Sequence, residues 1–177
     1  MLLGIHSLAA ALQLEIYWVY LTIKRKTQGL LSSGCSSIDS IGNKYRTDHQ
    51  DEILVYSLSH SMLRKKNINH QPVIIKKPVD KSTPLLGVAI SNNELMDCFI
   101  DFYRTSSNGG LELYFKLKLI GVQILEYSVI HPNYLDHNDQ QPQETLSLKY
   151  KSITWNHVIA GTSGYSIWED LKINSTM

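Results

Sequence analysis

The fold class is decided by residues 111–124, which read LELYFKLKLIGVQI. From Leu113 to Leu119, apolar side chains alternate with polar and charged ones, and this two-residue period is typical of a half-buried β-strand. At Gly121 the apolar positions change to the other parity and continue at Val122 and Ile124. Because successive side chains point to opposite faces of a strand, this change of face predicts a β-bulge or a sharp bend at Gly121.

The same period occurs outward from this stretch in both directions. It recurs in residues 96–102 and 145–150 and changes parity again before Ile153, and less regular strands are predicted at residues 17–23, 30–35, 52–61, 72–77 and 156–159. One helix is predicted, with Thr83 as its N-cap, Pro84 at its first helical position and its end at Ser91 to Asn93. We therefore predict a mainly β fold, an antiparallel two-sheet β-barrel with one flanking α-helix.

Composition narrows the function classes. The chain has 177 residues, a formal net charge of +1 and two cysteines, Cys35 and Cys98, without metal-ligand or disulfide-scaffold spacing. These values indicate one domain with its own core and argue against a nucleic-acid partner and a structural zinc site. We expect free cysteines and no cofactor.

No catalytic motif is found. The seven histidines show no metal-ligand spacing, and Gly161 to Gly164 misses the nucleophile-elbow spacing by one residue, so we interpret it as a loop. A hydrolase that uses Ser163 would need a histidine within hydrogen-bond reach. We expect no metal site, no catalytic residue and no enzyme activity.

Two strands carry patterns that bear on assembly. Residues 53–56 and 73–75 are apolar on both faces, which predicts a cover for the outer face, and a partner subunit is the economical candidate. Directly after residues 53–56, Ser57, Ser59 and Ser61 occupy alternate positions and form a row of small hydroxyl side chains on one face of the strand. This row is typical either of a solvated strand face or of the lining of a shared aqueous cavity.

The first fifteen residues differ from the rest. The charged residues begin at Glu15, and this apolar stretch is open to three interpretations: an addition to the fold, a peripheral helix, or an anchor or signal. We interpret residues 1–15 as an extension outside the fold, residues 16–170 as the domain and residues 171–177 as a tail.

Several stretches, in order along residues 17–170, together resemble one family. They are YLTIK at 20–24, DSIGNKY at 39–45, PVDKSTPLLG at 78–87, FYRT at 102–105 and IAGTSGYSIWED at 159–170. In these stretches the chain resembles the Hcp family, the haemolysin-coregulated tube proteins of bacterial type VI secretion. The resemblance implies a structural subunit that forms hexameric rings, which stack into a tube.

The resemblance also implies partners and a location. The expected partners are identical subunits in stacked rings, the sheath and spike proteins of the secretion apparatus, and small effectors carried in the lumen. Neither nucleic acid nor membrane insertion of the folded domain is implied. Assembly is expected in the bacterial cytoplasm, followed by export to the medium or into target cells without a cleaved signal peptide.

Two groups of residues are the expected functional sites. Ser57 matches a lumen-facing serine of the family, and Ser59 and Ser61 follow in the same row. Residues 37–50 resemble the family's extended loop, so Lys44, Tyr45 and Asp48 are expected at contacts between subunits or rings. The alternative function is a monomeric small-ligand-binding β-barrel, which would require an interior not filled by Leu146, Leu148 and Tyr150.

Overall fold

The structure, a computed structural model, describes residues 16–133, 135–136 and 141–168. It is mainly β, and all its strand pairs are antiparallel, which confirms that part of the predicted fold class. The strands are β1 (Tyr17–Arg25), β2 (Gly29–Leu30), β3 (Ile53–Val55), β4 (Ser57–Ser59), β5 (Met62–Arg64), β6 (Ile68–His70), β7 (Val73–Pro78), β8 (Met96–Thr105), β9 (Leu111–Ile130), β10 (Gln143–Lys149), β11 (Ser152–His157) and β12 (Thr162–Ile167).

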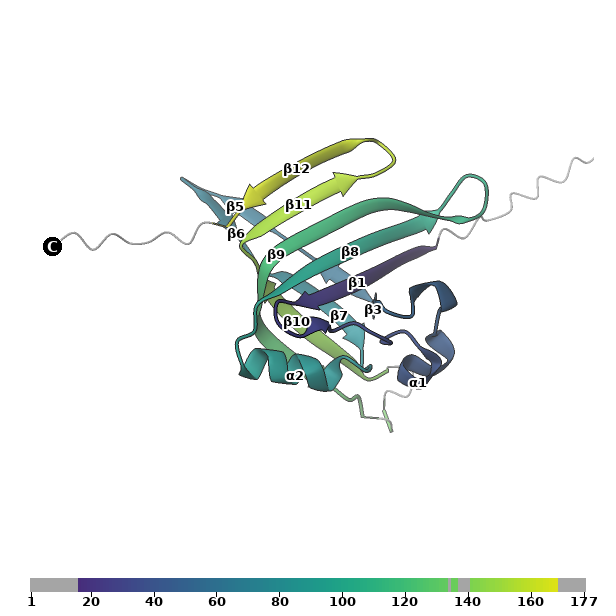
Figure 1. Ribbon diagram of the computed structural model, residues 1–177. Helices are drawn as coiled ribbons and strands as arrows, with labels where there is room; N and C mark the ends of the chain where they lie inside the picture. Colours follow the sequence, from purple (N-terminus) through teal and green to yellow (C-terminus); the bar gives the residue numbers. More distant parts are fainter. Residues whose placement is uncertain (1–15, 134, 137–140, 169–177) are drawn as a thin grey trace, which may run out of the picture.

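Ten of these strands belong to one hydrogen-bonded sheet with the order β2-β1-β8-β9-β10-β7-β4. The β11–β12 hairpin pairs with β9 through β11, and β3 pairs with the middle of β1. Strands β5 and β6 form a separate two-stranded ribbon, which projects from the body beside the end of β12 (Figure 1). Strands β3 and β4 are separated by Tyr56 alone, so one short segment pairs with β1 at one end and with β7 at the other.

Strand β9 joins the two halves of the sheet. Its first part pairs with β8 and β11, and its last part pairs with β10. Between these parts, Ile120 and Gly121 stand opposite the single residue Asp97 of β8, and Gly121 has a φ of +65°. Its N–H donates to the Asp97 carboxylate at 3.0 Å. The predicted bulge at Gly121 is therefore confirmed, since glycine adopts this left-handed conformation at little cost.

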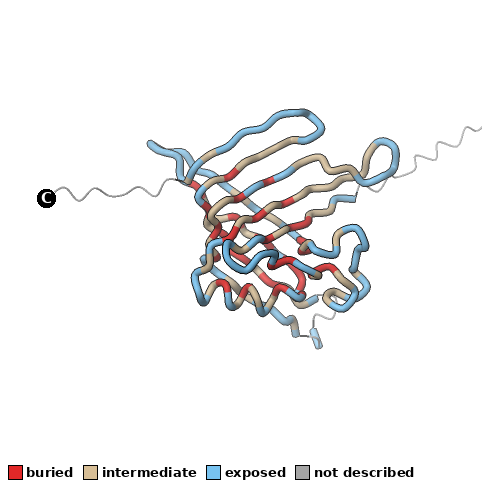
Figure 2. Tube along the Cα trace, in the orientation of Figure 1, coloured by how far each residue is buried: buried red, intermediate tan, exposed pale blue. Residues whose placement is uncertain are grey.

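The core lies between the two halves of the bent sheet, where buried residues of β1, β8, β9, β7 and β10 face one another (Figure 2). The side chains of Leu146, Leu148 and Tyr150 are fully buried in it. These residues fill the interior that a small ligand would need, which argues against the ligand-binding alternative.

The helices differ from the sequence prediction in detail. Helix α2 (Thr83–Ser91) covers one end of the sheet and begins one residue after its N-cap Ser82, so the prediction of Thr83 as N-cap was wrong. The Thr83 hydroxyl instead accepts the N–H of Asp80 at 3.0 Å. A second helix, α1 (Ile38–Ile41), and two 3-10 turns, η1 (Gly42–Lys44) and η2 (Thr47–His49), lie in the predicted extended loop.

Two strand predictions also need correction. Residues 31–35 form turns instead of a strand, and residues 162–164, which were predicted to lie in a loop, form the first half of β12. In β12, Gly164 pairs with Trp155, so the strand is specified by its neighbour rather than by its own weak pattern. The expectations for residues 1–15 and 171–177 lie outside the described residues. No helix of the described part is long and apolar enough to cross a membrane.

Candidate functional site

The predicted serine row lies on an uncovered face of the sheet. Ser57 and Ser59 are exposed on β4, and Ser61 is exposed just after it. Leu58, between them, packs against the core together with its neighbour Ile75 on β7. The alternation deduced from the sequence therefore separates a core face from a solvent face.

This face extends across four strands, and its residues are exposed or half-buried except Ser147 on β10, which is 6% exposed. Partners in the register show two rows of neighbouring side chains on this face: Ser57, Lys76, Thr145 and Ser128, and Ser59, Ile74, Ser147 and Glu126. Directly opposed residues of antiparallel strands share a face, so these eight side chains form one surface. We call it the polar face; beyond Ser57 and Ser59 it carries two further serines, one threonine, one isoleucine and two charged residues of opposite sign.

The extended loop, residues 37–50, covers the outer side of β3. Leu54 points away from the core cluster and is nevertheless only 5% exposed. It lies with Trp18 and Tyr56 in an open groove of about 680 Å³, whose other lining residues are Asn43 to Asp48 of the loop. The sequence predicts a cover for residues 53–56, with a partner subunit as the economical candidate; over Leu54 a segment of the same chain supplies this cover, while Tyr56 stays 41% exposed.

The loop is attached through its cations. The Lys44 ammonium donates to the Tyr56 hydroxyl at 2.7 Å and lies 5.2 Å from the centre of that ring. The Arg46 guanidinium lies 4.5 Å from the centre of the Trp18 ring. A cation above an aromatic ring is attracted to the negative face of that ring, so both residues hold the loop against the sheet. Tyr45 and Asp48 are exposed.

His49 completes this attachment. Its ring stacks on Tyr20 with 3.9 Å between centroids and meets the edge of Tyr103, and its Nδ1 contacts the Glu52 carboxylate. Burial raises the pKa of the Tyr20 hydroxyl, and burial together with the charge of Glu52 raises the pKa of Tyr103 to about 12. Both tyrosines therefore stay neutral under the loop at physiological pH.

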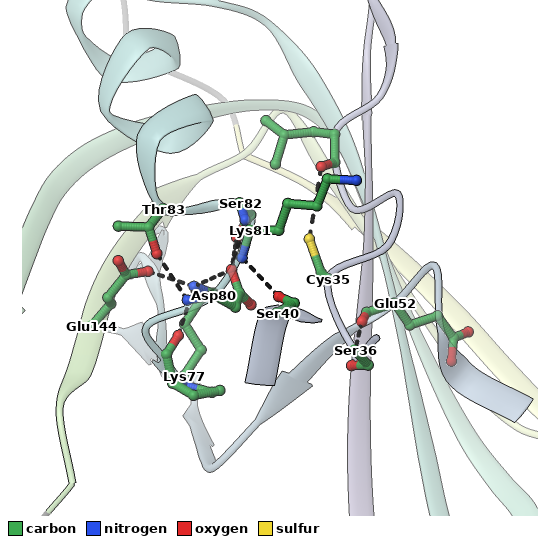
Figure 3. A network of polar contacts seen from close by, with 12 residues as sticks. Cys35, Ser36, Ser40, Glu52, Lys77, Asp80, Lys81, Ser82, Thr83 and Glu144 are labelled. Atoms are coloured by element: carbon green, nitrogen blue, oxygen red, sulfur yellow. Dashed lines mark hydrogen bonds and ion pairs between the residues drawn. The ribbon is translucent and has the colours of Figure 1, made fainter. Parts of the chain in front are cut away.

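A buried polar network underlies the other end of the loop (Figure 3). The Lys77 ammonium donates to the carboxylates of Glu144 and Asp80 and to the carbonyl of Pro78. All three charged side chains are excluded from solvent, with two carboxylates around one ammonium. Because Ser82 and Tyr127 donate to these carboxylates as well, the charges are stabilised where isolated ones would not be.

This network is connected to the loop through α1 and the turns before it. The Lys81 N–H, next to Asp80, donates to the Ser40 hydroxyl at 2.9 Å, and the Ser36 hydroxyl donates to the Glu52 carbonyl (Figure 3).

Both cysteines, Cys35 and Cys98, are free and buried, as the sequence predicts for free thiols.

A second network holds the base of the β5–β6 ribbon. The Tyr150 hydroxyl lies 2.7 Å from His60 Nε2 and 2.8 Å from His70 Nδ1, while His70 Nε2 lies 3.0 Å from the Ser166 hydroxyl. A hydroxyl can donate to one imidazole and accept from the other, so neutral histidines satisfy the whole chain of contacts. Burial lowers the pKa of both histidines and raises the pKa of Tyr150 to about 12.

The structure also locates the residues considered for chemistry. Ser163 is exposed on β12 and lines a small groove with His157, whose Nδ1 already accepts the N–H of Ala160 at 3.1 Å. Among the described residues, Ser163 has no hydrogen bond to a histidine, and no group of three metal-ligating side chains is present.

Known proteins share this sequence and this architecture. The family model for the type VI secretion system effector Hcp matches residues 20–157. The chain belongs to the Hcp family. It is 32% identical over 166 residues to the major exported protein of Pseudomonas aeruginosa, a match that covers 84% of this chain and 94% of that relative.

Solved structures agree with this assignment. The chain is similar to a crystal structure of an Hcp protein, with a TM-score of 0.82, 31% identity and coverage of 88% of this chain and 99% of the other. It is also similar to the secreted protein Hcp3 from Pseudomonas aeruginosa, with a TM-score of 0.79, 31% identity and coverage of 88% and 100%. This Hcp protein is thus a structural, exported protein of the type VI secretion tube, and the expectation of a non-enzyme is confirmed by its family.

Proposed function

We propose that six copies of this chain form a ring whose channel is lined by the polar face, and that such rings stack into the exported tube. The observation that carries the proposal is the exposure of the polar face. Ser57, Ser59 and Ser61 lie uncovered on a strand whose opposite side packs into the core. A hydrophilic bore lined by small side chains would leave room for small effectors, the proposed cargo of the lumen.

The wall of each subunit is proposed to close into a barrel through β3 and β4. These two strands follow each other across Tyr56 and pair with β1 and β7, which are far apart in the strand order. A continuous segment that pairs at both ends connects the two margins of the bent sheet. Closure would remove two of the edges that otherwise recruit other strands.

The extended loop is proposed to contact neighbouring subunits or rings through Lys44, Tyr45 and Asp48. Tyr45 and Asp48 are exposed beside the groove over Leu54, while Lys44 is partly engaged with Tyr56. Assembly in the cytoplasm, passage through the sheath behind a spike protein and release without a cleaved signal peptide complete the proposal.

Sedimentation velocity at micromolar concentration tests the ring. We expect a species with about six times the 20.1 kDa mass of the chain. A protein that sediments as a monomer from low to high concentration and from low to high salt would refute the ring.

Substitution of Ser57 tests the channel. Ser57→Arg should leave the subunit folded and the ring intact, because the side chain already faces solvent, but it should reduce the amount of small effector that copurifies with the rings. Ser163→Arg, on the exposed strand β12, is the matched control and should not reduce cargo. Equal cargo in both variants would remove Ser57 from the channel.

A further inference from the structure

We propose that the tip of the β5–β6 ribbon of one copy docks into a groove beside α1 of a second copy. The ribbon, residues 62–70, is called the arm below, and the groove is lined by Ser37, Asp39, Ser40, Val79, Asp80, Lys81 and Pro84. The inference rests on the proposed stacking of rings and gives that stacking a defined pair of surfaces.

The arm carries an apolar and strongly basic tip. It contains Arg64, Lys65 and Lys66 without any acidic residue. All three basic side chains are exposed, and they have no ion-pair partner in the described part of the chain. Leu63 and Ile68 beside them are 55% and 44% exposed. Exposed apolar residues next to unpaired cations indicate an interaction surface for an anionic partner.

The arm is held at its base, and these contacts keep its tip directed away from the rest of the subunit. A two-stranded hairpin is only marginally stable by itself. Here His70, the last residue of the arm, is 2% exposed and is fixed between Tyr150 and Ser166. His60, just before the arm, reaches the same Tyr150 hydroxyl. This pre-organisation lowers the entropy that docking would cost.

The groove beside α1 has the complementary character. It is an open groove of about 630 Å³ with Val79 and Pro84 as apolar lining and Asp39 in α1. Asp39 has no ion-pair partner among the described residues, and the neighbouring Ile38 is 60% exposed. Asp80, which also lines the groove, belongs to a buried cluster of two carboxylates and one ammonium, and its Oδ2 lacks a hydrogen-bond partner within the described chain. Lys81 also lines the groove, so the groove and the cluster behind it hold three carboxylates (Asp39, Asp80 and Glu144) against two ammonium groups (Lys77 and Lys81), and this negative balance favours a cationic occupant.

The two surfaces cannot meet within one subunit. The arm leaves the body where β4 ends and β7 begins, whereas Val79 and Asp80 follow the other end of β7. Six strand residues separate these ends by about 17 Å, and the arm and α1 lie on opposite sides of the molecule (Figure 1). A contact between different surfaces of identical copies is heterologous, and such contacts build rings or open filaments.

A second copy fits better than another anionic partner because the chain supplies both charges. Its formal net charge is +1, although residues 62–70 contribute three positive charges, so the remainder of the chain is slightly acidic. A membrane or a polyanion would not need the groove beside α1. Opposed charges at two ends of the same molecule steer identical copies into one orientation.

Cysteine cross-linking between two differently labelled variants tests the contact. One variant carries Asn67→Cys at the tip of the arm, and the other carries Ile38→Cys beside the groove. The native thiols do not interfere, because Cys35 and Cys98 are buried and burial raises the pKa of Cys35 to about 12. We expect a mixed disulfide-linked dimer that forms in preference to the control pair of Asn67→Cys with Asn108→Cys, an exposed residue of the β8–β9 turn.

Charge reversal gives the decisive comparison. The triple change Arg64→Glu, Lys65→Glu and Lys66→Glu should lower the yield of the 67–38 cross-link roughly tenfold, because three anions would then face Asp39 and Asp80 and the modest surface attractions would become repulsions. Asp39→Lys in the second variant should recover part of the yield. A yield no higher than that of the 67–108 control, or one unaffected by charge reversal, would overturn the proposal.

Two parallel measurements separate this proposal from the proposed ring. Arm variants that keep the ring mass in sedimentation but lose the cross-link support docking between rings. A pair of cysteine variants that forms the 67–38 cross-link, while the parent protein sediments as a monomer, would refute the ring and retain the arm contact. Binding of the parent to vesicles of phosphatidylglycerol without any 67–38 cross-link would overturn the arm contact in favour of a membrane partner.

Discussion

The extended loop and the arm both project from the same sheet, but they are held in different ways. The loop lies along the wall and is attached at many points, including Lys44 on Tyr56, Arg46 on Trp18 and His49 on Tyr20. The arm touches the body at its base, through His60 and His70. The loop therefore serves as part of the subunit's own cover, whereas the arm exposes nearly all of its surface.

The difference teaches that exposure and order are separate properties. The loop would keep its position if one of its several weak contacts were lost, whereas both histidines at the base of the arm share the Tyr150 hydroxyl. The following predictions alter the supports of these two regions, beginning with the largest expected effect.

The support beneath the loop depends on Lys77. Lys77→Met would leave the carboxylates of Asp80 and Glu144 buried without their cation, which should lower the free energy of unfolding by about 3–5 kcal/mol. Urea denaturation measures this change. Lys76→Met, the next residue on the exposed face, should change stability by no more than about 0.5 kcal/mol. Similar small losses in both variants would contradict a structural role for the buried ion cluster.

The support of the arm depends on Tyr150. Tyr150→Phe removes the hydroxyl shared by His60 and His70 and should cost about 1–3 kcal/mol, because buried ring nitrogens lose a partner. Hydrogen exchange should become faster in residues 62–70 and unchanged in the extended loop. Tyr165→Phe, on an exposed side chain, is the control. Equal acceleration in the loop would show that the two regions are not independent.

Acid should weaken the arm before it affects the loop. The folded-state pKa values of His60 and His70 lie below the ordinary value of 6.5, so the unfolded chain binds more protons as the pH falls. Stability should therefore be complete well above pH 6.5 and should decline from about pH 6.5 downward until the folded-state pKa values are reached.

Thermal denaturation between pH 5 and pH 8 measures this dependence, with hydrogen exchange reporting on the arm. The titratable neighbours of each imidazole are the other imidazole, Tyr150 and Lys149. The Lys149 ammonium lies over the Trp168 ring. A His60→Gln, His70→Gln variant should show a weaker decline over the same range. A decline as steep as that of the parent would assign the pH dependence to other groups.

The smallest effect is expected for single cations of the two regions. Arg46→Gln should lose the contact with Trp18, cost about 0.5–1 kcal/mol and alter the near-ultraviolet circular dichroism of tryptophan. Lys65→Gln in the arm, where the ammonium has no aromatic partner among the described residues, should leave both stability and spectrum unchanged. A spectral change in the second variant would contradict the difference between the regions.

The sequence correctly predicts those strands that have one face in the core and one face exposed to solvent. Residues 96–102 and 111–124 alternate because one face packs into the core and the other meets solvent, and the change of parity at Gly121 correctly locates the bulge. Strands β5, β6 and β12 lack this pattern, since the arm has no core face and β12 contains Gly164 opposite Trp155. Their pairing is a tertiary property that local periodicity does not contain.

The part of the candidate site that follows a regular two-residue alternation could be predicted from the sequence. The serine row follows from parity alone, and its exposure agrees with the sequence pattern, although its place in a channel stays a prediction. The contacts of Lys77 with Glu144 and of His70 with Tyr150 and Ser166 join residues 67 to 96 positions apart, so no local spacing reveals them. One signal was available: His60 has the same parity as the core-facing Leu58, which places its ring toward the interior.

Strand β9 has a mechanical consequence. Its twenty residues run without interruption through both halves of the sheet, and the bulge at Gly121 bends the backbone without severing the hydrogen bonds on either side. A pull on one half is thus carried to the other along covalent bonds, and separating the halves would require many hydrogen bonds to shear together. Gly121 therefore lets one strand turn the corner of the sheet while both halves stay on the same continuous backbone.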